Sequence, residues 1–405
     1  MAKLDELPMV SPVASVLADT ENFSLVLGGP LYQLYLRTRL AKLPLDLLLR
    51  RVIGLSLICW LPLLVLSVLG GRALGGVAVP FLRDVEPQTR FLVALPLLIA
   101  ADVFVHDRIG SVVRQFLSRG IIVPEDQPRF EGLIASTMRL RNSIPLEVVL
   151  VLVVYTLGHW VWTQKVSLNV GSWYAVKTSA VAHLTAAGYW YAFVSLPILR
   201  FIVFRWYFRL FLWYRFLWKV ARFPLHLKLF HPDCAGGLGF VSGSVFAFAP
   251  VLLARTVFLA GFIGDRIWHT GATLPSFKME IVGAMLILML VVLAPLSFFV
   301  IPLIQARRTA GREYGILASH YVDDFRNKWI TGNGRTSEPL LGTHDIQSLA
   351  DLGSAYNVVS EIRLLPFSKK TVLRLAIILV IPLLPLTLTI IPLEQMVDRL
   401  IKLAF

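Results

Sequence analysis

The sequence predicts an all-α polytopic membrane protein with about seven transmembrane helices and long cytoplasmic helix extensions. Hydrophobic residues make up 56% of the 405-residue chain and charged residues only 16%, against roughly 25% charged residues in soluble proteins. The stretches between hydrophobic runs carry, in chain order, six, three, six, two, six, two, nine and two Lys plus Arg. Basic residues concentrate in cytoplasmic loops, so this alternation predicts seven spans with the N-terminus inside and the C-terminus outside.

Seven hydrophobic runs are the expected spans, and most approach the ~20 residues needed to cross ~30 Å of hydrocarbon. They cover residues 52–69, 91–105, 146–162, 187–204, 239–263, 281–303 and 372–396. The second run is the shortest, and if it were re-entrant every later loop would change sides. The remaining segments complete a four-part organisation. The parts are a cytoplasmic N-terminal segment (1–50), a six-helix transmembrane region with helix extensions (51–304), a cytoplasmic helical segment (305–371) and the last span with an external tail (372–405).

Individual elements follow from local patterns. Residues 31–49 mix apolar and basic side chains, which suits an interfacial helix or, equally, a packed cytoplasmic one. Three spans lack helix breakers where the hydrocarbon should end, so helices are expected to continue to about residues 120, 222 and 329. Asp126 and Pro128 look like a helix start. A helix should also run from Asp345 to Pro366, because apolar residues recur there every three or four positions.

Composition excludes several classes of function. The net charge of +14 is explained first by topology and second by attraction to anionic lipids, so no nucleic-acid partner is expected. Two cysteines imply no disulfide framework. The chain has no HExxH, CxxC or nucleotide-binding motif, so neither a cofactor nor a metal nor a catalytic residue is predicted.

Three charged residues predicted to lie in or at the ends of membrane spans are candidates for function. Asp102 lies in the second span, Glu147 at the start of the third and Arg200 in the fourth, and we expect them to meet near the inner interface. Charges at such depth are costly and usually partnered. The cluster is either a static ion pair that joins three helices or part of a proton or ion pathway.

A glycine-rich turn precedes the fifth span. It contains His231, Asp233, Gly236, Gly237 and Gly239. Glycines permit a tight turn whose backbone N–H groups can hold an anion or a lipid headgroup at a helix start. Alternatively, Asp233 caps the helix and the turn is purely structural.

The cytoplasmic end of the fourth helix is rich in basic and aromatic residues. Its cations are Arg205, Arg209, Arg215, Lys219 and Arg222, and at 100° per residue they fall within roughly a 140° arc. One interpretation is an aromatic belt with cations at the headgroups. The other is a basic vestibule that concentrates anions at the mouth of a pore.

The strings HPDCAGGLGF and LLGTHDIQSLADLGSAYNVVSEIRLLPF, with the last span and PLEQMVDRL, resemble a group of bacterial multi-pass membrane proteins. The resemblance covers mainly residues 231–405. It implies a bacterial inner-membrane location and the same topology, but it transfers no activity and no catalytic residue.

Three hypotheses for function remain at this point. The first is a homo-oligomeric channel or transporter for an ion or small solute, with a basic cytoplasmic vestibule. The second is a membrane enzyme or a module that binds anionic lipid headgroups. The third is a membrane scaffold whose 305–371 segment recruits a cytoplasmic partner.

Overall fold

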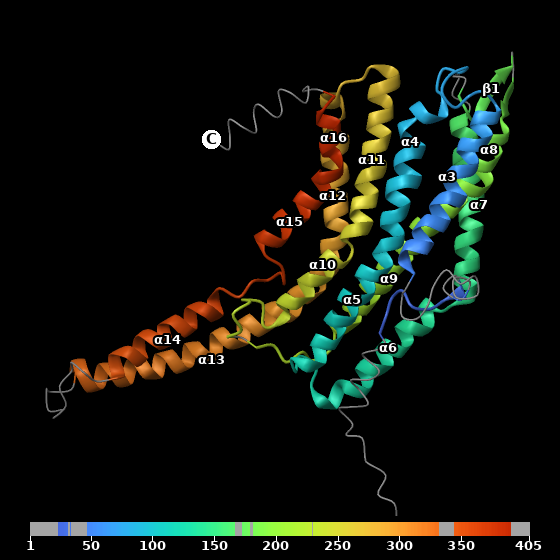
Figure 1. The fold of residues 1–405 in the computed structure, drawn as a ribbon. Coiled ribbons are helices and arrows are strands. Elements are labelled where there is room, and N and C mark those ends of the chain that lie inside the picture. Colours follow the sequence, from blue (N-terminus) through green and yellow to red (C-terminus); the bar gives the residue numbers. More distant parts are fainter. Residues whose placement is uncertain are drawn as a thin grey trace, which may run out of the picture.

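The computed structural model describes residues 23–30, 33, 47–166, 172–178, 181–228, 230–331 and 344–389. These residues are mostly helical. Long helices form a bundle that has a two-helix arm at one end and a short strand hairpin at the other (Figure 1). We call these the arm end and the hairpin end.

Five helical runs are long and apolar enough to cross a membrane, which agrees with an all-α membrane protein. They are α3 (Leu48–Leu69), the run Val85–Ser118, the run Ala186–Val220, the run Leu274–Thr331 and the run Lys369–Thr387. A sixth candidate is a bent pair, Leu238–Ala247 and Ala249–Thr270, whose halves meet at 41°. At the remaining predicted span lies α7 (Ile144–Val166). The number seven, the sides of the membrane and the cytoplasmic location of the helix extensions stay predictions.

Several runs are built from successive elements without an intervening loop. The second comprises α4 (Val85–Gln88), a wide π-helical segment η2 (Thr89–Ala94) and α5 (Leu95–Ser118). The third comprises α8 (Ala186–Trp190), a π-helical segment η4 (Tyr191–Ser195) and α9 (Leu196–Val220). The bent pair comprises η5 (Leu238–Ser242), α10 (Gly243–Ala247) and α11 (Ala249–Thr270).

The C-terminal half continues in the same way. The longest run comprises η6 (Leu274–Phe277), α12 (Lys278–Leu293), η7 (Ala294–Phe299), α13 (Val300–Arg326) and η8 (Asn327–Thr331). It is followed by α14 (His344–Ser360), α15 (Lys369–Val380), η9 (Ile381–Leu383) and α16 (Leu384–Thr387). The expected interfacial helix at 31–49, the end of the last span and the tail lie almost wholly outside the described residues.

Helix boundaries predicted from local signals agree with the structure. A short turn, η3 (Pro124–Asp126), leads into α6 (Gln127–Arg141), as the Asp126 and Pro128 pattern predicts. α14 falls inside the predicted 345–366 helix apart from its first residue. The second, fourth and sixth spans run on as helices to Ser118, Val220 and Thr331.

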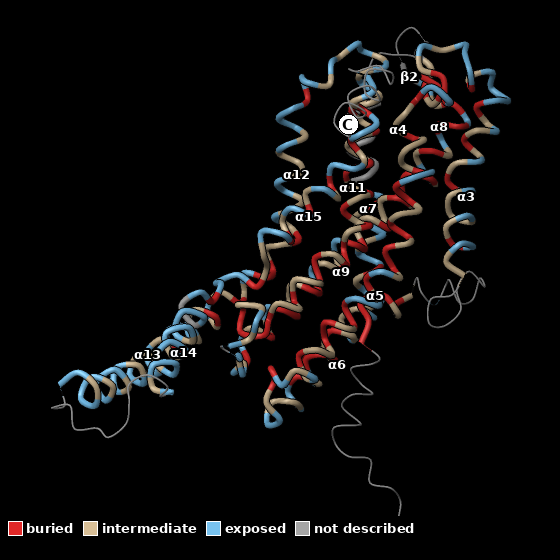
Figure 2. The backbone as a smooth tube through the Cα atoms, turned by 60° about the vertical axis from the view of Figure 1, so that its left-hand side comes forward, coloured by how far each residue is buried: buried red, intermediate tan, exposed pale blue. Residues whose placement is uncertain are grey.

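The buried core follows α5, α6 and α9 and continues to α4 and α8 at the hairpin end, whereas α12, α13 and α14 are largely exposed (Figure 2). Phe116 of α5 is at the centre of an aromatic group. Its ring contacts those of Phe130 (6.2 Å), Phe240 (4.9 Å) and Phe299 (6.2 Å). The four rings hold α5, α6, η5 and η7 together, although these elements come from distant parts of the sequence.

A two-stranded hairpin departs from the all-α prediction. β1 (Ala175–Thr178) pairs antiparallel with β2 (Val181–Leu184). Next to it Trp173 is buried against Phe81, with ring centroids 4.9 Å apart. Each strand is only four residues long, which is too short for an alternating pattern to be recognised in a hydrophobic sequence.

The arm is a helical hairpin made by α13 and α14 (Figure 1). At its tip Asp345 accepts hydrogen bonds from Lys328 Nζ (2.8 Å) and Trp329 Nε1 (3.0 Å), and the Asp345 carbonyl accepts one from Tyr321. The bonds from Lys328 and Trp329 lower the pKa of the Asp345 carboxyl. Asp345 therefore fastens the start of α14 to the end of the long helix.

Candidate functional site

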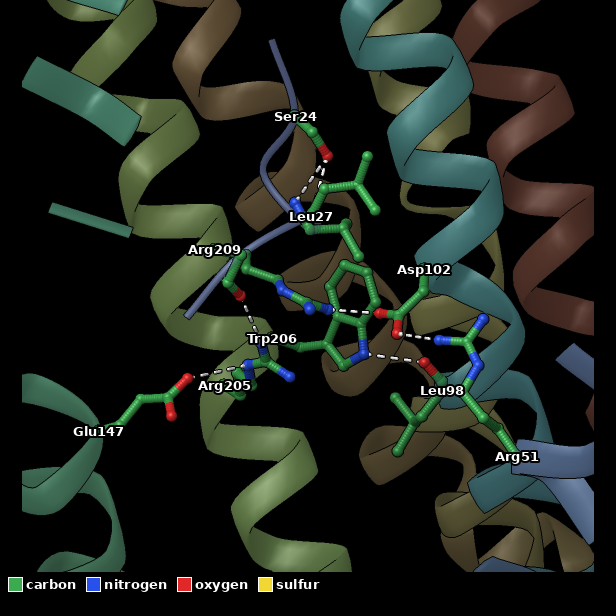
Figure 3. A network of polar contacts seen from close by, with 11 residues as sticks. Ser24, Leu27, Arg51, Leu98, Asp102, Glu147, Arg205, Trp206 and Arg209 are labelled. Carbon is green, nitrogen blue, oxygen red and sulfur yellow. Dashed lines mark hydrogen bonds and ion pairs between the residues drawn. The ribbon is translucent and has the colours of Figure 1, made fainter. Parts of the chain in front are cut away.

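Asp102 is the centre of a buried charge network that joins three helices (Figure 3). Its two carboxylate oxygens contact Arg51 Nη1 of α3 at 3.3 Å and Arg209 Nη1 of α9 at 2.5 Å. Asp102 is 7%, Arg51 0% and Arg209 4% exposed. A carboxylate this deep requires such partners, since removing one partner of a buried pair costs about 3–5 kcal/mol.

Trp206 connects this network to the bent helix pair. Its Nε1 donates to the Leu98 carbonyl at 2.9 Å, and the Arg209 guanidinium lies 4.5 Å from its ring centroid. The same ring is perpendicular to that of Phe248, at 6.5 Å. Phe248 is the residue between α10 and α11. The break in that span therefore packs against Trp206, whose ring also lies under the Arg209 guanidinium.

A second ion pair lies one turn back along α9. Arg205 Nε contacts Glu147 of α7 at 3.6 Å, and an Arg205 Nη donates to the Gly28 carbonyl at 3.3 Å (Figure 3). Glu147, predicted to join Asp102, thus belongs to a separate pair. The expected cluster is divided between two arginines of α9 that are one turn apart.

The N-terminal segment 23–30 covers this region. Arg141 donates to the Ser24 carbonyl, while the Ser24 hydroxyl accepts from the backbone N–H groups of Val26 and Leu27. Burial, with the Arg209 charge nearby, lowers the pKa of Arg141 to about 10. The carbonyls of Ser24 and Gly28 therefore accept hydrogen bonds from Arg141 and Arg205, in addition to the contacts that Asp102 and Glu147 make in this region.

The prediction that Arg200 belongs to the cluster is wrong. Among the described residues no ion pair of Arg200 is found, and its nearest charged and phenolic neighbours are Arg90 and Tyr191. Arg200 precedes Arg209 by nine residues, which at 100° per residue places it on the opposite side of α9. The residue that sequence reasoning missed is Arg51, because its position at the start of the first span does not indicate which residue it pairs with.

The glycine-rich turn already contains its own anion. The Asp233 carboxylate accepts hydrogen bonds from the backbone N–H groups of Ala235 (2.9 Å), Gly237 (3.1 Å) and Gly239 (2.7 Å). His231 Nδ1 lies 3.0 Å from the same carboxylate. The donors expected to bind an external anion are thus occupied, and the structural interpretation of the turn holds.

The glycines of the turn are required by its geometry. Gly236 and Gly237 have φ values of +64° and +88°, which residues other than glycine rarely adopt. At Gly239 an added Cβ would lie 2.9 Å from the Asp233 side chain. The three residues therefore serve to wrap the backbone around Asp233.

The five cations of the α9 end do not form one basic surface, which corrects the predicted vestibule. Arg205 and Arg209 are buried in ion pairs, and Arg215 donates to Ser136 Oγ at 3.0 Å. Lys219 is half-buried, and only Arg222 is exposed. The pairing of Arg205 and Arg209 could not be derived from the periodicity of one helix, because it depends on the neighbouring helices α5 and α7.

A second acidic group, not predicted from the sequence, lies at the hairpin end. Asp84 caps α4 by accepting from the Glu86 N–H, and its other oxygen accepts from Trp173 Nε1 at 2.8 Å. The negative charge of Asp265 on α11 acts on Asp84, and His269 Nε2 is 3.4 Å from Asp265. Like charges this close oppose each other's ionisation.

The environment of Asp84 explains its proton affinity. Burial first, and then the charges of Asp265 and Glu86, raise the pKa of Asp84 to about 7, against the opposing effect of the Trp173 hydrogen bond. Arg90 forms an ion pair with Glu86 and donates to Tyr191 at 2.8 Å. Arg90 is therefore paired with Glu86 rather than with Asp84.

Metal chemistry receives no support from the parts of the chain that the structure describes, because no group of three or more potential ligands lies together there. A groove of about 780 Å³ is present at the arm end, between the end of α9 and the start of α13.

The fold and these sites define the chain as a mostly helical membrane protein with a buried charge network beside a broken helix. Comparisons with protein families, with curated proteins and with solved structures found no match. The resemblance of residues 231–405 to bacterial multi-pass proteins accordingly stays a prediction.

Proposed function

We propose that this chain is a membrane transport protein, a channel or transporter for an ion or small solute. Its transport site lies where the break between α10 and α11 packs on the Asp102 network. The observation that carries the proposal is Trp206, whose ring contacts both Phe248 at the break and the guanidinium of Arg209. Interrupted helices beside buried charges are typical of solute sites in secondary transporters.

The charge network can change partners at low net cost. Breaking either Asp102 pair outright would leave a buried charge uncompensated. A solute anion that takes the place of Asp102 on Arg209 avoids that penalty, because Asp102 keeps its contact with Arg51. This exchange would remove one of the links between α5 and α9 and shift the guanidinium that lies over the Trp206 ring.

Two π-helical segments add a means of bending. η2 precedes α5 and η4 precedes α9, so both network helices contain a wide turn toward the hairpin end. Each segment is followed within two residues by a proline, Pro96 or Pro197. Such turns weaken the regular hydrogen-bond ladder and often mark functional hinges.

The direct test is conductance of the purified protein in a planar bilayer under a salt gradient, with ion flux into vesicles measured in parallel. We expect Asp102→Asn to abolish transport while the variant still folds. Glu147→Gln is the matched control, because it removes a buried carboxylate from the neighbouring pair without contact to the break. Wild-type protein that carries neither current nor flux would contradict the proposal. Failure of Asp102→Asn to fold would instead favour a purely structural network.

Location and assembly belong to the same proposal. The alternation of basic residues supports a bacterial inner-membrane orientation with the arm end in the cytoplasm, and we propose a homo-oligomer. Cys234 is a natural reporter because it is partly exposed near the arm end, whereas Cys59 is buried. In intact cells of a Cys59→Ser variant, a membrane-impermeant maleimide should leave Cys234 unlabelled; labelling would reverse the orientation. Native mass spectrometry checks the oligomer.

A further inference from the structure

The groove at the arm end is amphipathic. Its apolar wall includes Phe223 from the chain after α9 together with Phe298 and Ile301, and its polar residues include Gln305 and Thr309 of α13. Along α13, polarity therefore increases from Ile301 to Thr309, a distance of about 12 Å at ~1.5 Å per residue. The apolar part adjoins the membrane helix α12 and the polar part lies farther along the arm.

The groove carries positive charge. Arg222 lines it and is exposed, with its guanidinium 3.6 Å from the ring centroid of Trp218, which also lines the groove. No acidic side chain is among the described residues that line it. Stacking on Trp218 orients the guanidinium while its N–H groups stay available to an anion.

An exposed apolar track leads from the groove along α12. Leu286 and Leu290 lie one turn apart on α12, and Ile301 lies beyond the 3₁₀ segment η7, near the start of α13. Leu286 is 62%, Leu290 66% and Ile301 66% exposed. The track is about 20 Å long, more than one leaflet of a ~30 Å hydrocarbon core.

We propose that this groove binds an anionic phospholipid, with the phosphate at Arg222 and an acyl chain along the exposed face of α12. Charge complementarity selects the anionic headgroup, and the α12 face provides the apolar surface that a free phosphate would not use. The glycine-rich turn is not part of this site, because Asp233 occupies its donors. The inference goes beyond the transport proposal and does not depend on it, since its readout is lipid binding.

The test is native mass spectrometry of the full-length protein titrated separately with phosphatidylglycerol and phosphatidylcholine. Arg222→Gln should weaken phosphatidylglycerol binding about tenfold, as expected for loss of one charge-assisted contact, and leave phosphatidylcholine binding unchanged. Arg266→Gln is the matched control, because Arg266 also lies over an aromatic ring, 4.6 Å from the centroid of Phe262, but on α11 near the hairpin end. It should bind both lipids as the wild type does.

A second variant makes the test independent of Arg222. Thr309→Glu places a negative charge in the polar part of the groove on an exposed position, so it should also weaken phosphatidylglycerol binding selectively. Equal affinity of wild type and both variants would overturn the proposal. So would equal binding of the two lipids by the wild type, or full displacement of phosphatidylglycerol by millimolar inorganic phosphate, which would indicate a simple anion site.

Discussion

The raised pKa of the buried Asp84 carboxyl predicts an unusual response to its replacement by an amide. The pKa of Asp84 is raised from 3.8 to about 7, so folding must retain a proton that the unfolded chain releases above pH 4. Each pKa unit corresponds to ~1.4 kcal/mol, and three units make about 4 kcal/mol. The contribution is fully present below pH 4 and is lost as the pH rises to 7, so wild-type stability should fall through that window.

Asp84→Asn removes the ionisable group. The amide can accept from Trp173 and places no charge beside Asp265, but it has one acceptor oxygen instead of two, which weakens the cap on α4 by about 1 kcal/mol. We therefore expect the variant to be about 3 kcal/mol more stable than wild type at pH 8. At pH 4, where the wild type keeps its proton, the variant should be slightly less stable.

Thermal unfolding followed by tryptophan fluorescence in detergent, at steps from pH 4 to pH 8.5, measures this effect. Asp126→Asn, at the start of α6, is the control for replacing an acidic residue before a helix. His269, Glu86 and Arg90 also face the pair, so His269→Gln should be measured to separate its titration. The reasoning is refuted if wild-type stability is flat or rises between pH 4 and 7, or if Asp84→Asn retains the wild-type slope.

Two further perturbations follow from contacts at the arm end. Gly239→Ala should destabilise the protein by about 1–3 kcal/mol, because its Cβ would lie 2.9 Å from Asp233. Gly243→Ala is the control and should not destabilise it, because no atom lies within 4 Å of the added Cβ. An equal shift of the thermal unfolding midpoint in both variants would contradict this. Asp345→Asn should speed amide hydrogen exchange in η8 and at the start of α14, because it weakens the hydrogen bonds from Lys328 and Trp329. Exchange in α5 should not change. Unchanged exchange at the tip of the arm would show that packing alone holds α13 and α14 together.

The helices were predictable from the sequence, whereas the contacts between residues of different helices were not. The α9 extension and the start of α6 follow from runs without helix breakers and from capping residues, which are local properties. The partner of Asp102 depends on which helices become neighbours, so Arg51, fifty-one positions away, carried no signal beyond its place at the start of a span. Asp84 and Asp265 are likewise joined only by the packing of α4 on α11.

The arm is continuous with a membrane helix, and this has a mechanical consequence. α13 extends the run that begins at Leu274 without a loop, and its 27 residues span about 40 Å. A rotation of about 5° at its base would displace the tip by roughly 3–4 Å. A soluble protein that binds the 305–371 segment, as the scaffold hypothesis requires, would therefore be rigidly connected to the base of α13. Movement of that protein would shift the wall of the groove that contains Ile301.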